Sequence, residues 1–176
     1  MQIWLDTVNI DLVKDASGII SGVTTNPSIL SHTSDIPKTF KNLLTVQSGP
    51  IAVQVTSAET HSMIEEGRQI YAFSKRMIIK VPVNPPGLAA MKQLVNENIP
   101  VLGTAVFHPA QALLAANIGA SYVAPYYSHI GEHATQVLTT IAALLRNRQT
   151  KLMAASVKSL EDIITCALIG VEAITI

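Results

Sequence analysis

The sequence predicts an α/β protein whose single domain, residues 1–176, is a compact (β/α)8 barrel. Short apolar runs of strand length alternate with longer segments in which apolar residues recur at helical spacing. Such strict alternation requires a parallel sheet. There are eight strand candidates, the number that closes this kind of sheet into a barrel. The last of them ends the sequence, so we expect a barrel in which the helix after the eighth strand is missing.

The eight predicted strands are rich in aliphatic and β-branched residues. They are Gln2–Asp6, Ile19–Thr24, Ile51–Thr56, Met77–Val81, Val101–Val106, Tyr122–Tyr126, Leu152–Ser156 and Ala173–Ile176. The helices between them have recognisable starts. Asn84 and His108 each precede a proline that suits the first helical position, and Ser57 is placed to open the third helix. Gly119 and Gly170 are typical helix ends.

Composition and charge exclude several classes of function. The 12 lysines and arginines balance the 12 aspartates and glutamates, so no basic face for nucleic acid is indicated. The sequence begins with a strand pattern instead of the basic and apolar regions of a signal peptide. No apolar run approaches the roughly 20 residues of a membrane span. We therefore expect a cytoplasmic protein that binds neither nucleic acid nor a membrane.

Lys80 stands out because its neighbours in the fourth predicted strand are all apolar. A buried ammonium loses its hydration, so a buried lysine relieves that cost by lowering its pKa. A neutral amine is a nucleophile toward carbonyl groups. Taken alone, Lys80 is therefore either a strand-end lysine whose tip reaches water or the reactive group of an enzyme.

Polar residues interrupt the apolar runs near the end of nearly every predicted strand, where the active sites of (β/α)8 barrels lie. They are Asp6, Thr24, Thr25, Asn26, Gln54, Lys80, Thr104, Tyr126 and Ser156. One such residue is explained by a helix cap, but so many around one barrel mouth predict a functional site. In that site Thr24, Asn26 and Ser156 suit hydrogen bonds that fix substrate hydroxyls.

These residues suit a reaction in which the Lys80 amine attacks a carbonyl group. An amine that attacks a ketone forms a carbinolamine and then an imine, and both steps need proton transfers. Asp6 suits an exchange of protons with substrate hydroxyls. Tyr126 suits an acid/base role, with a water held by Gln54 and Thr104. A protonated imine on Lys80 is an electron sink, so it eases cleavage of the adjacent carbon–carbon bond.

The same residues carry a resemblance to the transaldolase family, and within it to the fructose-6-phosphate aldolase branch. The matching segments occur in the family's order and are Trp4–Thr7, Gly22–Ser28, Val53–Val55, Ile79–Val83, Leu102–Val106, Tyr122–Tyr126 and Ala154–Ser156. The most specific is Gly-Val-Thr-Thr-Asn-Pro-Ser. The resemblance implies a class I aldolase barrel without cofactor or metal. Its Schiff-base lysine is Lys80, and its substrate is a sugar or sugar phosphate.

Two positions resemble the aldolase branch more than the transaldolases. Transaldolases usually carry glutamate at the position of Gln54 and phenylalanine at that of Tyr126. The implied reaction is cleavage or formation of a ketose such as fructose 6-phosphate, from a dihydroxyacetone unit and an aldehyde. Transfer of the same unit between sugar phosphates, as in a transaldolase, is the alternative.

Three features depart from the family's pattern. His129 replaces an arginine that usually binds the acceptor phosphate, and a mostly neutral imidazole does not grip phosphate bidentately. The phosphate is then expected on Ser156, Lys158 and the start of the seventh helix. The loop after His129 is shorter than usual. The final helix, which in the family packs over the barrel and often reaches a neighbouring subunit, does not follow the eighth predicted strand here. Either the sequence is cut short at Ile176 or this variant assembles differently, and we still expect a homo-oligomer.

Other interpretations of the sequence are weaker. His129–His133 fits the H-x-x-E-H zinc pattern, but Gly131 interrupts the helix that has to present both histidines, and no third ligand is evident. A degenerate barrel that binds sugar phosphate without turnover conflicts with the intact polar set. A Schiff-base aldolase of another type, such as a deoxyribose-phosphate aldolase, conflicts with the Thr24–Ser28 segment.

Overall fold

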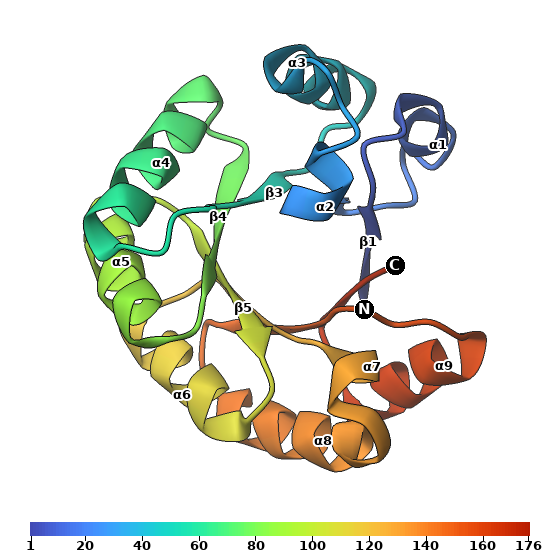
Figure 1. Cartoon of the computed structure of the whole chain (residues 1–176). Coiled ribbons are helices and arrows are strands. Elements are labelled where there is room, and N and C mark those ends of the chain that lie inside the picture. Colours follow the sequence, from blue (N-terminus) through green and yellow to red (C-terminus); the bar gives the residue numbers. More distant parts are fainter.

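The computed structural model describes residues 1–176 and shows the predicted fold. Eight parallel strands pair with their sequence neighbours, and the last pairs with the first to close a barrel (Figure 1). The strands are β1 Gln2–Asp6, β2 Gly22–Thr24, β3 Ile51–Gln54, β4 Met77–Pro82, β5 Val101–Val106, β6 Tyr122–Pro125, β7 Lys151–Ala154 and β8 Ala173–Thr175. The prediction of a (β/α)8 barrel is thus confirmed, and no helix follows β8 within these residues.

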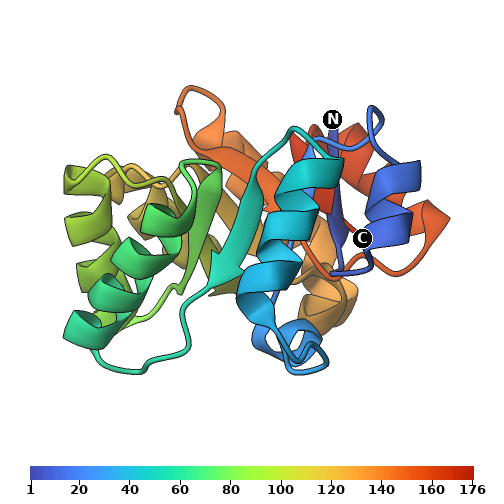
Figure 2. The same cartoon turned by 90° about the horizontal axis from the view of Figure 1, so that it is seen from above.

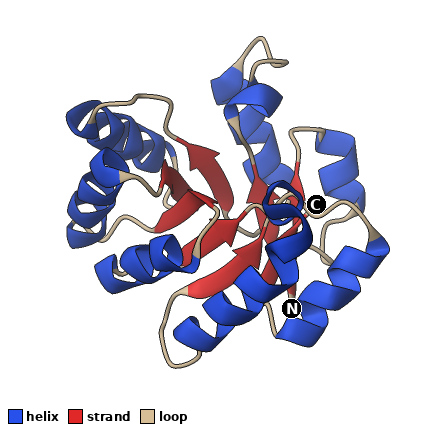
Figure 3. Ribbon diagram, turned by 60° about the horizontal axis from the view of Figure 1, so that its bottom comes forward, coloured by secondary structure: helices blue, strands red, loops and turns tan.

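Helices surround the strands (Figure 3). They are α1 Ile10–Asp15, α2 Pro27–Leu30, α3 Ile36–Val46, α4 Thr60–Phe73, α5 Pro85–Asn96, α6 Pro109–Ile118, α7 Tyr127–Ile130, the 3₁₀ turn η1 Gly131–His133, α8 Ala134–Leu145 and α9 Leu160–Ile169. The connections after β2 and β6 contain short extra helices, α2 and α7. Figure 2 shows α2 at the opposite end of the barrel from the N-terminus. None of the helices combines the length and the apolar character needed to cross a membrane.

The second strand begins at Gly22, later than the predicted start at Ile19. Gly18 adopts φ +93°, a left-handed backbone that favours glycine. The amides of Ile19 and Ile20 then both donate to the Ala16 carbonyl. These residues therefore form the turn that leaves α1, and the Ile19 side chain is exposed.

The third predicted helix begins at Thr60, as α4, and the predicted start at Ser57 is wrong. The Glu66 carboxylate accepts hydrogen bonds from the Thr56 amide and the Ser57 hydroxyl, each at 2.6 Å. Partial burial opposes ionisation of Glu66, but these hydrogen bonds prevail and lower its pKa. A carboxylate of the helix itself thus holds the β3–α4 loop in place, and the helix begins only after this loop.

Other helix boundaries agree with the sequence. Asn84 Oδ1 accepts from the Gly87 amide at 2.8 Å and caps α5. His108 Nδ1 accepts from the Ala110 amide at 3.1 Å at the start of α6. Gly119 and Gly170 end α6 and α9 in the left-handed conformation.

The core of the protein has two layers. Side chains that point into the barrel form one layer and are Trp4, Ala52, Ile78, Leu102, Tyr122, Ala124, Met153, Ala155 and Ala173. A larger layer lies between the strands and the outer helices. The Trp4 ring meets the Tyr122 ring edge-on, with centroids 5.5 Å apart. The barrel interior is therefore packed with side chains, as barrels of this class require.

Candidate active site

A polar cavity of about 530 Å³ opens at the C-terminal ends of the strands. Its lining consists of Asp6, Asn26, Pro27, Ser28, Ile29, Gln54, Lys80, Tyr126, His129, Ala155, Ser156, Lys158 and Thr175. The lining includes every site residue predicted from the sequence except Thr24, Thr25 and Thr104. A concave site of this size suits a small molecule.

Lys80 is 7% exposed and reaches this cavity from β4. Its Nζ donates a hydrogen bond to the Thr25 carbonyl at 2.6 Å. Burial lowers the pKa of Lys80 below its ordinary value of 10.5, although the negative charge of Asp6 acts in the opposite direction. Because a carbonyl oxygen only accepts, it engages one N–H and leaves the lone pair of a neutral amine free to attack.

Asp6 ends β1, and two side chains of the β2 region hold its carboxylate. The Thr24 hydroxyl donates to Oδ1 at 2.6 Å, and Asn26 Nδ2 donates to Oδ2 at 3.0 Å. Asn26 is itself fixed, because its Oδ1 accepts from the Ile29 amide and caps α2. Both carboxylate oxygens therefore have defined directions at the edge of the cavity.

Thr24 lies beneath Asp6 and does not line the cavity. It is 1% exposed, and besides Asp6 its hydroxyl contacts the Thr175 hydroxyl at 2.6 Å. The position differs from the direct hydrogen bond to substrate that the sequence suggests for Thr24. Its contacts make it a support for Asp6.

Tyr126 presents a phenol whose direction is fixed on several sides. Its hydroxyl lies 2.9 Å from the hydroxyl of Thr104, which is fully buried. The two hydroxyls are therefore in direct hydrogen-bond contact. The Tyr126 ring packs against Phe107 and His129, with centroids 5.6 and 5.5 Å away.

An irregular pairing of β5 with β6 determines the position of Thr104. Ala105 has φ 55°, and the strand register shifts between Gly103 and Val106. Residues two apart in a regular strand face the same side. Here the extra residue lets Thr104 face the Tyr126 hydroxyl while Val106 packs in the outer layer of the core. A non-glycine residue in this backbone region costs on the order of 1–3 kcal/mol, which the surrounding barrel has to offset.

The remaining predicted residues form other parts of the wall. Gln54 pairs in register with Lys80 across β3 and β4, so the two side chains are neighbours in the lining. Ser156 has φ 58°, and its hydroxyl lies 2.7 Å from that of Ser128. Lys158 and His129 complete this polar wall. The lining thus offers an ammonium, an imidazole and hydroxyls to a substrate.

The start of α9, where the sequence predicts part of a phosphate site, already has an internal carboxylate acceptor. The Asp162 carboxylate accepts from the amides of Lys158 and Ser159, at 3.4 and 3.2 Å. Ser159 in return accepts from the Asp162 amide, which completes a capping box. A phosphate would therefore share this helix start with the Asp162 carboxylate, which already engages the Lys158 and Ser159 amides.

The H-x-x-E-H segment does not form the helical face that such a zinc site needs. Helix α7 ends at Ile130, and Gly131 has φ 74°. His129 packs on the Tyr126 ring, whereas His133 lies in η1 and pairs with the exposed Glu132 at 3.6 Å. The two histidines therefore belong to different elements.

Thr175 and Ser28 line the cavity but are absent from the residues predicted from the sequence. Thr175 follows the apolar Ala173 and Ile174, so the criterion that selects Lys80 also finds it. Ser28 lies on the short helix α2, which the sequence pattern does not separate from the rest of its connection.

Comparison with known proteins agrees with the motifs of the sequence. Residues 3–176 match the family model described as Transaldolase/Fructose-6-phosphate aldolase. The chain belongs to this family. A probable transaldolase from Thermoplasma volcanium is 36% identical over 187 residues, which cover 100% of this chain and 84% of that protein. A probable transaldolase from Clostridium perfringens is 35% identical, with 100% and 86% covered.

Membership of the transaldolase/fructose-6-phosphate aldolase family confirms the resemblance found in the sequence. Among solved structures, the orotidine 5'-monophosphate decarboxylase from Metallosphaera sedula superposes with a TM-score of 0.74 over 99% of this chain and 87% of that one. The two sequences are only 9% identical, so this similarity shows the shared barrel fold alone.

Proposed function

We propose that this family member is a class I aldolase in which Lys80 forms an imine with a ketose. The reaction cleaves or forms the bond between a dihydroxyacetone unit and an aldehyde, with fructose 6-phosphate as the expected ketose. The observation that carries the proposal is the buried Lys80 amine in a polar cavity, with its Nζ on the Thr25 carbonyl. The imine itself serves as the electron sink, so the proposed chemistry requires no cofactor.

The proposed steps use the phenol of Tyr126 twice. The neutral Lys80 amine adds to the ketose carbonyl and gives a carbinolamine. Tyr126 donates a proton to the carbinolamine hydroxyl, which leaves as water, and a protonated imine and a phenolate remain. The phenolate then takes the proton of the hydroxyl beside the breaking bond, and the electron pair of that bond moves to the imine. The aldehyde leaves, and an enamine stays on Lys80.

Release of the donor product reverses these roles. The phenol returns its proton to the enamine carbon, and water adds to the protonated imine as the phenolate takes a proton from it. The carbinolamine then collapses to dihydroxyacetone and the free Lys80 amine. The contact between the Tyr126 and Thr104 hydroxyls supports this cycle, because it can hold the phenolate with a hydrogen bond.

Borohydride reduction in the presence of fructose 6-phosphate or dihydroxyacetone tests the imine. We expect one covalent adduct, which peptide mass mapping locates on Lys80. Lys158 is the matched control, because it also lines the cavity. The adduct should persist in Lys158→Met and disappear in Lys80→Met; an adduct on any other lysine, or none, contradicts the proposal.

A transaldolase that passes the dihydroxyacetone unit between sugars is the second candidate, and the names of the probable transaldolases support it. Gln54 and Tyr126 favour the aldolase, because at these two positions the sequence resembles the aldolase branch of the family more than the transaldolases. Fructose 6-phosphate supplied without an acceptor separates the two, because only outright cleavage releases free dihydroxyacetone. The double variant Gln54→Glu, Tyr126→Phe should shift the enzyme toward transfer.

We propose a sugar phosphate as substrate, with weaker phosphate recognition than an arginine at position 129 provides. Lys158 and Ser156 are the groups in the lining that suit this contact. Comparison of kcat/KM for glyceraldehyde 3-phosphate and glyceraldehyde measures the preference. It should be modest and should increase in His129→Arg; a strong preference in the wild type contradicts this part of the proposal.

We further propose that the protein is a cytoplasmic homo-oligomer. Leu160, Ile164 and Leu168 lie four residues apart on α9 and are 73, 59 and 84% exposed, which supports self-association through this helix. Light scattering measures the molar mass. Ile164→Lys should shift an oligomer toward the monomer without loss of the fold, and a monomeric wild type contradicts the proposal.

A further inference from the structure

Three side chains from neighbouring strands form a chain of hydrogen bonds across the seam where the barrel closes. Thr175 of β8 contacts Thr24 of β2, and Thr24 contacts Asp6 of β1, both at 2.6 Å. The strand register brings them together, because Asp6 pairs with Thr24 and Thr175 pairs with Trp4. The chain of bonds therefore links the last strand of the barrel to the carboxylate on the first.

The direction of these hydrogen bonds follows from the donors available. A threonine hydroxyl has one proton, and an ionised carboxylate only accepts. The Thr24 proton therefore goes to Asp6, so the bond between the two hydroxyls has to use the proton of Thr175. The Thr175 oxygen then keeps acceptor capacity that Thr24 does not use.

That oxygen belongs to the end of the chain that faces the cavity. Thr175 is 5% exposed and lines the cavity, whereas Thr24 lies behind it. A largely buried acceptor is satisfied best when a donor reaches it, and sugar hydroxyls are such donors. From this geometry we infer that Thr175 is a further substrate-binding residue, which accepts a hydrogen bond from a sugar hydroxyl.

The inference rests on the proposed sugar chemistry and adds a coupling between binding and the carboxylate. With substrate bound, the hydrogen bonds run in one direction, from the sugar hydroxyl through Thr175 and Thr24 to Asp6. Bonds aligned in this way polarise one another, and here they end on a charge. Thr175 is thus the binding residue, and Thr24 is a positioning residue that acts through Asp6.

Thr175→Val tests the inference, because it removes the hydroxyl at nearly constant volume. The KM for the ketose should rise about three- to tenfold, as expected for one lost neutral hydrogen bond, while kcat changes less. Thr175→Ser keeps the hydroxyl and should restore the KM. Thr150→Val is the matched control, since Thr150 is also buried and its hydroxyl donates to the Ala120 carbonyl, away from the cavity.

The outcomes separate this inference from the proposed function. If borohydride traps no adduct on Lys80 of the wild type, the Schiff-base function fails. If the adduct forms but Thr175→Val has the wild-type KM, or Thr150→Val raises the KM as much, only the role of Thr175 is overturned. The temperature of unfolding should match between the two valine variants. Thr175→Ala gives the same comparison if Thr175→Val does not fold.

Discussion

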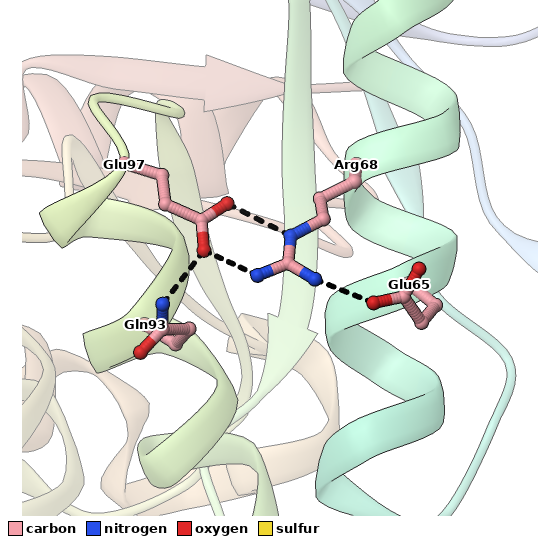
Figure 4. A network of polar contacts seen from close by, with 4 residues as sticks. All are labelled: Glu65, Arg68, Gln93 and Glu97. Atoms are coloured by element: carbon pink, nitrogen blue, oxygen red, sulfur yellow. Dashed lines mark hydrogen bonds and ion pairs between the residues drawn. The ribbon is translucent and has the colours of Figure 1, made fainter.

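Two clusters of charged side chains in this barrel lie in opposite environments. On the outer surface, Arg68 of α4 lies between Glu65 of the same helix and Glu97 that follows α5 (Figure 4). Arg68 binds Glu97 through Nε and Nη2, at 2.9 and 2.6 Å, and Gln93 adds a hydrogen bond at 2.7 Å. The bonds to Glu97 raise the pKa of Arg68, and in return those from Arg68 lower the pKa of Glu97 to about 2. Every charge is retained.

Lys80 at the barrel mouth shows the opposite behaviour. Its hydrogen-bond partner is the neutral Thr25 carbonyl, and burial lowers its pKa although Asp6 is nearby. Access to water and the charge of the partner therefore decide whether a basic group keeps its proton. The exposed cluster keeps its charges and lies on the outside of two helices. The buried amine is the one that we propose as the nucleophile.

The sharpest way to break this comparison is to remove the buried amine. Lys80→Met should lower kcat/KM by at least about 10³-fold, because no imine forms. Lys158→Met makes the same replacement at another lysine of the cavity and should affect mainly the KM for phosphorylated substrates. A steady-state assay measures both; comparable losses in the two variants would mean that Lys80 has no special role.

The second largest effect should come from the phenol beside it. Tyr126→Phe removes the proposed acid/base hydroxyl and should lower kcat about 10²-fold, while borohydride still traps substrate slowly on Lys80. Thr104→Val leaves the phenol but removes its partner and should cost less than Tyr126→Phe. A larger loss of kcat in Thr104→Val than in Tyr126→Phe would contradict the proposal that the Tyr126 hydroxyl is the acid/base group.

The pH dependence of activity should reflect the titration of Lys80. Attack requires the neutral amine, so kcat/KM should rise with pH and level off at the lowered pKa, below 10.5. A rate that keeps rising until pH 10.5 would show that burial does not shift this group. The profile is best measured with an unphosphorylated substrate, so that phosphate ionisation does not contribute.

The lowered pKa of Lys80 also makes the stability of the fold depend on pH. Between the lowered pKa and 10.5, the unfolded chain holds the Lys80 proton and the folded chain does not, so stability rises with pH. Lys80→Met lacks this dependence and should be more stable than the wild type near neutral pH, on the order of 1 kcal/mol. Urea unfolding measures the difference, which should shrink as the pH approaches 10.5; a destabilised Lys80→Met contradicts the prediction.

The smallest effect should come from the exposed cluster. Arg68→Met should lower the temperature of unfolding only slightly, because solvated ion pairs contribute little. The difference should nearly vanish in about 1 M salt, where charges on the surface are screened. Activity should be unchanged. A large loss of stability, or any loss of activity, would show that the outer cluster matters more than its exposure implies.

Sequence patterns predict the parts of this site that depend on strand order. Lys80, Gln54 and Tyr126 are polar residues late in apolar strands, and a closed parallel barrel brings such positions to one mouth. Individual hydrogen bonds are harder to predict, because they depend on the stagger between distant strands. Thr24 and Thr175 are 151 residues apart, and only the closure of β8 on β1 makes them neighbours.

Local backbone exceptions are the other part that the sequence does not reveal. Alanine has no preference for a left-handed backbone, so nothing at Ala105 indicates the irregularity that turns Thr104 toward Tyr126. The early start predicted for α4 fails for a similar reason. Ser57 is a good cap by residue type, but its hydroxyl donates a hydrogen bond to the carboxylate of Glu66, nine residues further along the chain.

The partner of the Lys80 amine belongs to the main chain, and this affects how the site can vary. The Thr25 hydroxyl points elsewhere and donates to the Ala52 carbonyl, while the Thr25 carbonyl holds Lys80. A point mutation can replace a side chain but cannot delete a carbonyl. Residues around the cavity can therefore diverge, through natural drift or in a directed-evolution library, while the anchor of the proposed nucleophile is inherited with the fold.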